Sequence, residues 1–131
     1  MEMADSGEVF VTLFRDSREE ALPLVQRFYD LGFNVTATPG TARFLREHGI
    51  HTRELPKIDA EHSEILEELR QGRIAYVINT RDPHSLSHAT AGFTIRSCAA
   101  ACGVTTFTAL DTAAAVLDVL EETALHVAPI V

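Results

Sequence analysis

The segment F-N-V-T-A-T-P-G-T at positions 33–41 carries the clearest signal of the fold. Its apolar and β-branched start predicts a strand, and the Pro-Gly-Thr that follows predicts a turn into a helix. Such a turn directs backbone N–H groups and the positive end of the helix dipole toward one place. Thr38 and Thr41 lie on either side of Gly40, so their hydroxyls are suited to bind an anion such as phosphate there. Taken alone, this short stretch favours a structural explanation, in which Thr38 ends the strand, Pro39 starts the turn and Thr41 caps the helix.

Apolar segments alternate with amphipathic segments along the rest of the chain. This alternation implies right-handed strand-helix-strand crossovers and therefore an α/β domain. We expect a doubly wound, three-layer sandwich in which helices cover both faces of a parallel five-stranded sheet. The more polar strand at 50–55 is expected near an edge. The expected strands are 8–14, 33–38, 50–55, 73–80 and 104–108, and the expected helices are 17–31, 42–48, 61–71, 90–102 and 111–123.

Two details of the helices follow from residue type and spacing. Pro23 falls inside the first helix, and because proline is tolerated only near a helix start, this helix is expected to begin late. In the last helix, the spacing predicts that one apolar stripe faces the sheet. The residues of that stripe are Ala115, Val116, Val119 and Leu120.

Composition limits the partners of the protein. The chain has 131 residues, of which 46% are hydrophobic, and a formal net charge of -8. This size fits one domain, expected at 8–123, with a linker or disordered stretch at 1–7 and a tail at 124–131. The negative charge disfavours nucleic acids and anionic membranes as partners. No apolar run approaches the roughly 20 residues of a membrane span, and the first residues lack signal-peptide features, so a cytoplasmic location is expected.

Polar and basic residues follow several of the expected strands at their carboxyl ends. In a parallel sheet these ends share one edge, so we expect their side chains to face a common crevice. Cations beside threonine hydroxyls and a helix N-terminus suit a phosphate, although each cation taken singly is also explained as a solvated surface charge. Asn79 offers both a donor and an acceptor to a ligand, or to the adjacent turn. The cations concerned are Arg15, Arg18, Lys57 and Arg81.

Residues for catalysis or metal binding are less clearly marked. Asp16 and Asp82 fall at the same edge and are candidates for a general base, but a cap and a turn before proline explain them equally well. His62, His84 and His88 form a weak metal pattern because no third ligand is indicated. No phosphate-binding P-loop, dinucleotide-binding or serine-hydrolase motif occurs. We therefore assign no catalytic residue, metal or cofactor to this domain.

With these features placed, residues 8–122 resemble the methylglyoxal-synthase-like superfamily. Within it the chain is most similar to the C-terminal regulatory domain of the carbamoyl phosphate synthase large subunit. The most specific run is L-G-F-N-V-T-A-T-P-G-T-A-R-F-L-R-E-H-G-I, because this family uses A-T-x-G-T to hold the phosphate of its ligand. The other runs are V-F-V-T-L-F-R-D-S-R-E-E-A, the lysine of L-P-K, R-Q-G-R-I-A-Y-V-I-N-T and I-R-S-C-A-A-A-C-G-V-T-T-F-T-A-L-D-T-A-A-A-V.

The resemblance implies allosteric control of carbamoyl phosphate synthesis for pyrimidine and arginine biosynthesis. The implied effector is phosphorylated and similar to uridine or inosine monophosphate, or an acetylated amino acid as in some relatives. The parent ligase would contain synthetase domains that use ATP, magnesium and potassium ions, together with a glutamine amidotransferase small subunit. Residue by residue, the resemblance assigns the effector phosphate to Arg18, Thr38, Gly40, Thr41, Lys57, Asn79 and Thr80, with Arg81 and Asp82 as additional ligand contacts.

Two departures from the family patterns bear on function. The family often has Thr-Pro-Ser or Thr-Thr-Ser where this chain continues from Asn79 into Thr-Arg-Asp-Pro, which leaves the effector open. The alternative is a free-standing methylglyoxal synthase, whose general base is an aspartate in a G-P-x-G-G-D-Q stretch. The matching stretch here reads P-K-I-D-A-E-H-S-E and aligns His62 with that aspartate, whereas Asp16 and the Asp82-Pro83 pair match positions that the enzyme uses. The missing base favours binding over catalysis.

Overall fold

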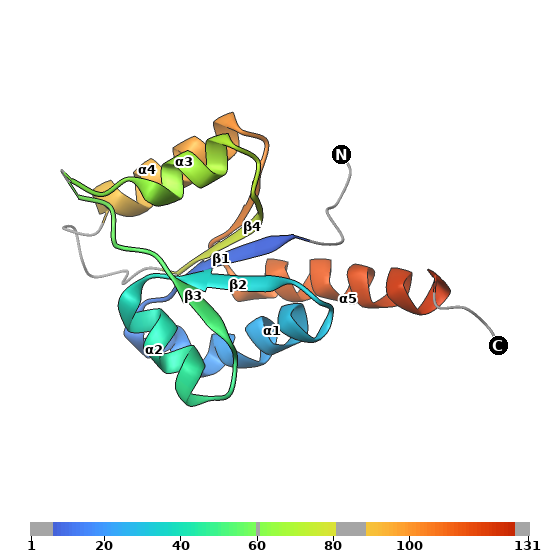
Figure 1. Cartoon of the computed structure of the whole chain (residues 1–131). Helices are drawn as coiled ribbons and strands as arrows, with labels where there is room; N and C mark the ends of the chain where they lie inside the picture. The colour runs from blue at the N-terminus through green and yellow to red at the C-terminus, as the bar shows by residue number, and fades with distance from the viewer. Residues whose placement is uncertain (1–6, 60, 81–88, 128–131) are drawn as a thin grey trace.

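A computed structural model describes residues 7–59, 61–80 and 89–127 of the protein (Figure 1). Strands and α-helices alternate through these residues, and a short 3-10 helix, η1 (Arg15–Ser17), follows the first strand. The strands are β1 (Glu8–Thr12), β2 (Asn34–Ala37), β3 (Thr52–Glu54), β4 (Ile74–Asn79) and β5 (Thr105–Phe107). The helices are α1 (Arg18–Asp30), α2 (Pro39–Glu47), α3 (Glu64–Arg70), α4 (Ala89–Ala101) and α5 (Leu110–Val127).

The strands form one five-stranded sheet in the order β3-β2-β1-β4-β5, and every pairing is parallel. The predicted doubly wound α/β fold with a parallel five-stranded sheet is therefore confirmed, as is the edge position of β3. Both faces of the sheet are covered, with α1, α2 and α5 on one side and the α3–α4 pair on the other (Figure 1). This arrangement explains why the middle of β1 (Val9–Val11) and most of β4 (Ile74–Ile78) are apolar.

Alternate residues of each central strand enter two separate cores. In β1, Val9 and Val11 point to the core formed with α1, α2 and α5, whereas Phe10 points to the core formed with α3 and α4. In β4, Tyr76 and Val77 divide in the same way. Because side chains alternate along a strand, the polar residues at the ends of β1 and β4 also point to one face of the sheet or the other.

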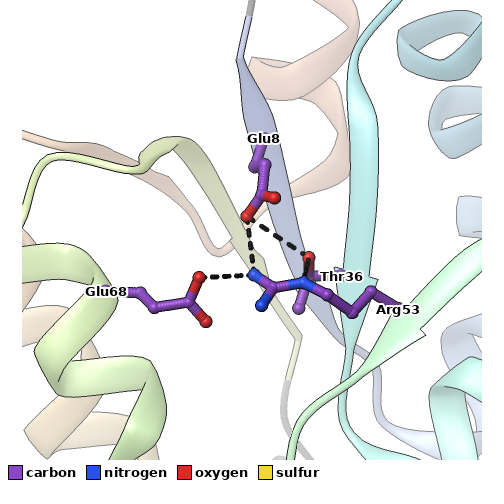
Figure 2. Close-up of polar contacts among 4 residues, drawn as sticks. All are labelled: Glu8, Thr36, Arg53 and Glu68. Carbon is purple, nitrogen blue, oxygen red and sulfur yellow. Dashed lines mark hydrogen bonds and ion pairs between the residues drawn. The ribbon is translucent and has the colours of Figure 1, made fainter.

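Polar side chains fill part of the space between α3 and the edge of the sheet (Figure 2). Arg53 of β3 reaches toward α3 and pairs with the buried carboxylate of Glu68. Its Nη2 also lies 2.8 Å from Oε2 of Glu8, and its Nε donates to Oγ1 of Thr36 at 3.3 Å. These hydrogen bonds raise the pKa of Arg53, chiefly through Glu68. One arginine thereby links β1, β2 and α3 to the edge strand.

The start of α1 agrees with one sequence-based expectation and not with another. The helix begins at Arg18 with Ser17 as its N-cap residue, so the expected start at residue 17 is confirmed. Pro23 lies in its second turn, so the later start that this proline suggested was wrong. Proline lacks an N–H, so the carbonyl of Glu19 loses its helical partner. Glu19 lies in the exposed first turn, where this loss is tolerated.

The last helix is rotated and longer than predicted. Its buried residues are Ala113, Leu117 and Leu120, whereas Ala115 is exposed and Val119 is 43% exposed, so their predicted inward orientation was wrong. The rotation matches the contact with α1, because Arg27 of α1 binds Asp118 and Glu121 on the neighbouring face. The helix continues to Val127, past the end at residue 123 that the sequence indicated.

Candidate anion-binding site

The topology of the sheet creates a switch point between β1 and β4. The helix that follows β1, α1, covers one face of the sheet, and the helix that follows β4, α4, covers the other (Figure 1). In open parallel sheets, ligands bind in the crevice that such divergence opens at the carboxyl ends of the strands. Thr12 and Asn79, the last residues of β1 and β4, are register partners at this point. The predicted phosphate residues of β4 and of the β2–α2 turn lie on the same edge.

Arg18 lies directly against Gly40 in the first turn of α2. Its Nη2 is 2.8 Å from the position that a Cβ atom on residue 40 would occupy. The guanidinium has no carboxylate partner within the part of the chain that the structure describes, and its buried Nε has no hydrogen-bond partner there. A buried donor without an acceptor is costly, so this arginine is prepared to accept an anion.

The two predicted threonine ligands have different surroundings. Thr38 is the N-cap residue of α2, it is 7% exposed, and its Oγ1 donates to Oγ1 of Thr12 at 3.3 Å. Thr41 is 1% exposed, and its Oγ1 accepts a 3.0 Å hydrogen bond from the backbone N–H of Leu13. Thr41 therefore does not cap the helix, which begins at Pro39; it secures the segment that leaves β1. Its role toward phosphate stays a prediction.

Thr80 holds the connection between β1 and α1. Its Oγ1 accepts a hydrogen bond from the backbone N–H of Phe14 at 2.8 Å and lies 2.6 Å from Oγ of Ser17. The Ser17 hydroxyl in turn donates to the carbonyl of Phe14 at 2.8 Å. These bonds fix the short η1 turn that precedes Arg18. A direct role of Thr80 toward phosphate stays a prediction.

Asn79 is 5% exposed and is held by a residue that the sequence analysis did not select. Nη1 of Arg96 donates to Oδ1 of Asn79 at 3.0 Å. The same nitrogen lies 2.9 Å from the position of a Cβ atom on Gly92, in the first turn of α4. One feature of the sequence could have identified Arg96, because it is the sole charged residue in the segment 89–101. A lone charge among small and apolar residues indicates a specific partner.

The remaining candidates are less closely tied to this crevice. Lys57 is exposed after β3, and Arg15 and Asp16 are exposed in η1. Nδ1 of His62 lies 3.0 Å from Oδ1 of Asp59, whose pKa is lowered, first by the backbone N–H of Glu61 and then by His62. The predictions for Arg81, Asp82, His84 and His88 lie outside the described residues. Among described side chains, no group of three His, Cys, Asp or Glu residues is placed to hold a metal ion.

A groove of about 670 Å³ opens beside the Arg18 contact. It runs between α2 and β3, and Gly40 belongs to both the groove and the contact with Arg18. Arg46 is engaged there by the carbonyl of Thr52 and by Glu54. The other residues lining the groove are Pro39, Arg43 and Glu47.

The fold places the protein in the class of doubly wound, three-layer α/β domains with an all-parallel sheet. A family model described as the MGS-like domain matches residues 20–108, which is more than half of the chain. The protein therefore belongs to the MGS-like domain family, and the resemblance to the methylglyoxal-synthase-like superfamily is confirmed at this level. Family membership fits both a regulatory domain and a methylglyoxal synthase. In the described residues, no helix is both long and apolar enough to cross a membrane.

Proposed function

We propose that this domain binds a phosphorylated small molecule at the switch point of its sheet and acts as a regulatory module. The observation that carries the proposal is the unpaired guanidinium of Arg18 against Gly40. A protein with a net charge of -8 has many carboxylates available, yet none in the described chain neutralises this arginine. An anionic ligand would supply the missing partner.

Phosphate is the anion that suits these surroundings best. A guanidinium forms two parallel hydrogen bonds with phosphate oxygens, and the first turn of α2 adds backbone N–H groups and the positive end of its dipole. Gly40 permits close approach because it has no side chain. Thr38 at the end of β2 supplies a polar group near Gly40, and Asn79 supplies another at the end of β4, on the other side of β1. The exposed Lys57 after β3 is proposed as a further cation. The groove between α2 and β3 offers room for a nucleoside attached to the phosphate.

Binding is favoured over phosphate elimination by the groups near the third strand. Abstraction of a proton beside a carbonyl requires a base within reach of the substrate. His62 replaces the aspartate that serves as base in methylglyoxal synthases, and its Nδ1 is directed to Asp59. The absence of an aspartate at this position, and not the contact with Asp59, supports a domain without catalysis of its own.

The parent protein is proposed to be the large subunit of a glutamine-hydrolysing carbamoyl phosphate synthase. The effector would be a nucleoside monophosphate similar to uridine or inosine monophosphate. Its binding would favour one arrangement of this domain against the synthetase domains, with a coupling free energy of about 1–3 kcal/mol. ATP, magnesium and potassium ions would act in those synthetase domains, and the amidotransferase small subunit would supply ammonia.

Isothermal titration calorimetry with inorganic phosphate, uridine monophosphate and inosine monophosphate tests this function. Binding of at least one ligand is expected, and Arg18→Gln should weaken it at least about tenfold because a charge-assisted hydrogen bond is lost. Arg15→Gln, which removes the same charge from an exposed site three residues earlier, is the matched control and should bind normally. No binding of any of the three ligands by the wild type would refute the proposal.

A methylglyoxal assay with dihydroxyacetone phosphate tests the alternative. The regulatory proposal expects no product above the uncatalysed rate. Product formation that disappears in the Arg18→Gln variant would instead identify a free-standing phosphate-eliminating lyase.

A further inference from the structure

Arg96 and Asn79 form a polar pair beside the switch point. Arg96 reaches from the second turn of α4 to the end of β4, where its Nη1 lies 3.0 Å from Oδ1 of Asn79. Side chains on a helix lean toward its N-terminus, and the lack of a side chain at Gly92 provides the space that this guanidinium occupies. Asn79 is almost fully buried, so its amide has a defined environment.

The chemistry of arginine determines which way the Asn79 amide faces. A guanidinium carries only hydrogen-bond donors, so it bonds the oxygen end of an amide and not the nitrogen end. The amide oxygen of Asn79 is therefore directed to Arg96. The –NH2 group is the opposite end of the side chain, and it is a pure donor.

We infer that Arg96 is a positioning residue that makes Asn79 select hydrogen-bond acceptors on the ligand. This inference rests on the proposed function and extends it. The –NH2 group of Asn79 would donate to a phosphate, carboxylate or carbonyl oxygen and would discriminate against a donor at the same place. Because β2 and β4 are separated by β1, this contact lies about 10 Å from the strand that leads to Gly40. A ligand that contacts both Gly40 and Asn79 would therefore have its anionic group on one side of β1 and a second oxygen acceptor on the other side.

Nuclear magnetic resonance observes this amide directly. The chain contains only two asparagines, Asn34 and Asn79, and two glutamines, so four side-chain –NH2 signals are expected. The Asn79→Ala variant identifies the signal of that residue by its absence. Titration with uridine monophosphate and inosine monophosphate should shift the Asn79 signal. Asn34 is exposed at the start of β2, at the other end of the sheet, and its signal should not move.

Three substitutions of Arg96 separate hydrogen bonding from charge. Arg96→Lys keeps a charged donor, Arg96→Gln keeps a neutral donor, and Arg96→Met keeps neither. If Arg96 orients Asn79, Arg96→Met should weaken nucleotide binding about tenfold, the loss expected for one well-placed hydrogen bond to a charged group. Arg96→Gln should then bind more tightly than Arg96→Met, and Arg96→Lys should bind within about threefold of the wild type. Thermal unfolding of each variant separates these effects from a general loss of stability.

The outcomes distinguish this inference from the proposed function. Equal weakening in Arg96→Gln and Arg96→Met would show that charge alone matters and would overturn the orienting role. The orienting role is also overturned if a nucleotide binds without shifting the Asn79 signal. It is overturned as well if Arg96→Met binds nucleotide normally while Arg18→Gln does not. Failure of the wild type to bind any of the nucleotides or phosphate would refute the proposed function and this inference with it.

Discussion

The guanidinium of Arg18 occupies the space that a side chain at Gly40 would need. Nη2 of Arg18 lies 2.8 Å from the position of a Cβ atom on residue 40. Gly40 belongs to a regular helix and is not among the described glycines with positive φ. Its small size, and not its conformational freedom, is therefore what the site requires.

Gly40→Ala should displace Arg18 without damaging the fold. The clash involves the far end of a flexible side chain, and alanine is a better helix former than glycine. The free energy of unfolding should therefore change by less than about 1 kcal/mol, while phosphate affinity should fall about tenfold. Urea denaturation and calorimetry measure the two quantities.

The same substitution in the Arg18→Gln background provides the control for Gly40→Ala. If the two residues act together, Gly40→Ala should add no further loss once Arg18 is gone, as expected for coupled residues in a double-mutant cycle. Additive losses would show that Gly40 contributes to binding independently of Arg18.

Thr41→Val should destabilise the protein through the segment after β1. The substitution keeps the shape of the side chain but removes the acceptor of the Leu13 N–H, which is buried together with Thr41. An unsatisfied buried donor costs about 1–3 kcal/mol in the free energy of unfolding. Urea denaturation measures the loss, and Thr41→Ser, which keeps the hydroxyl, should retain most of the stability. Equal stability of the two variants would contradict the assigned hydrogen bond.

Arg53→Met should destabilise the edge of the sheet and leave phosphate binding unchanged. The carboxylate of Glu68 would remain buried without its counter-ion (Figure 2). Because the side chain of Arg53 is 45% exposed, the expected loss is about 1–3 kcal/mol, between values for surface and buried pairs. Adding Glu68→Gln to this variant should restore part of the stability, since an amide needs no counter-ion. No recovery in urea denaturation would mean that packing, and not charge, explains the loss.

Stability in acid should depend on the ion pairs between α1 and α5. Arg27 holds both carboxylate oxygens of Glu121, at 3.0 Å and 2.6 Å, and lowers the pKa of that carboxyl. The Glu121 carboxylate therefore binds a proton less readily in the folded protein than in the unfolded chain. The resulting stabilisation is complete above a pH of about 4.3, the ordinary pKa of glutamate, and disappears as the pH falls through the lowered value.

Arg27→Gln is therefore expected to lower stability near neutral pH and to have little effect in strong acid. Because the Arg27–Glu121 pair is partly exposed, the free energy of unfolding of the variant should be lower than that of the wild type by about 0.5–1 kcal/mol near neutral pH. Thermal unfolding at several pH values measures it. The matched control is Arg70→Gln, which removes a 3.7 Å pair with Glu67 between two side chains that are each more than half exposed, and it should show no such pH dependence.

The elements of the fold could be predicted because they depend on local patterns. The apolar runs around Val9 and Val77, and the turn at Gly40, mark buried strands and a strand-to-helix connection through residue type alone. Errors occurred where one element is oriented by another. The inward face of α5 is the example, since Ala115 and Val119 fit the helical period but face away from the sheet.

The candidate site was only partly predictable for the same reason. The sequence alone determined a parallel α/β fold, and it identified Arg18, Thr38 and Asn79 as polar residues following its strands, because strand ends can be located from hydrophobic periodicity. Only the tertiary structure decided which of these groups are already engaged. The Arg18 contact with Gly40, the use of Thr41 by Leu13 and the hold of Arg96 on Asn79 join residues 17 to 28 positions apart. No local pattern encodes such distances, because they are set when the helices pack against the two faces of the sheet.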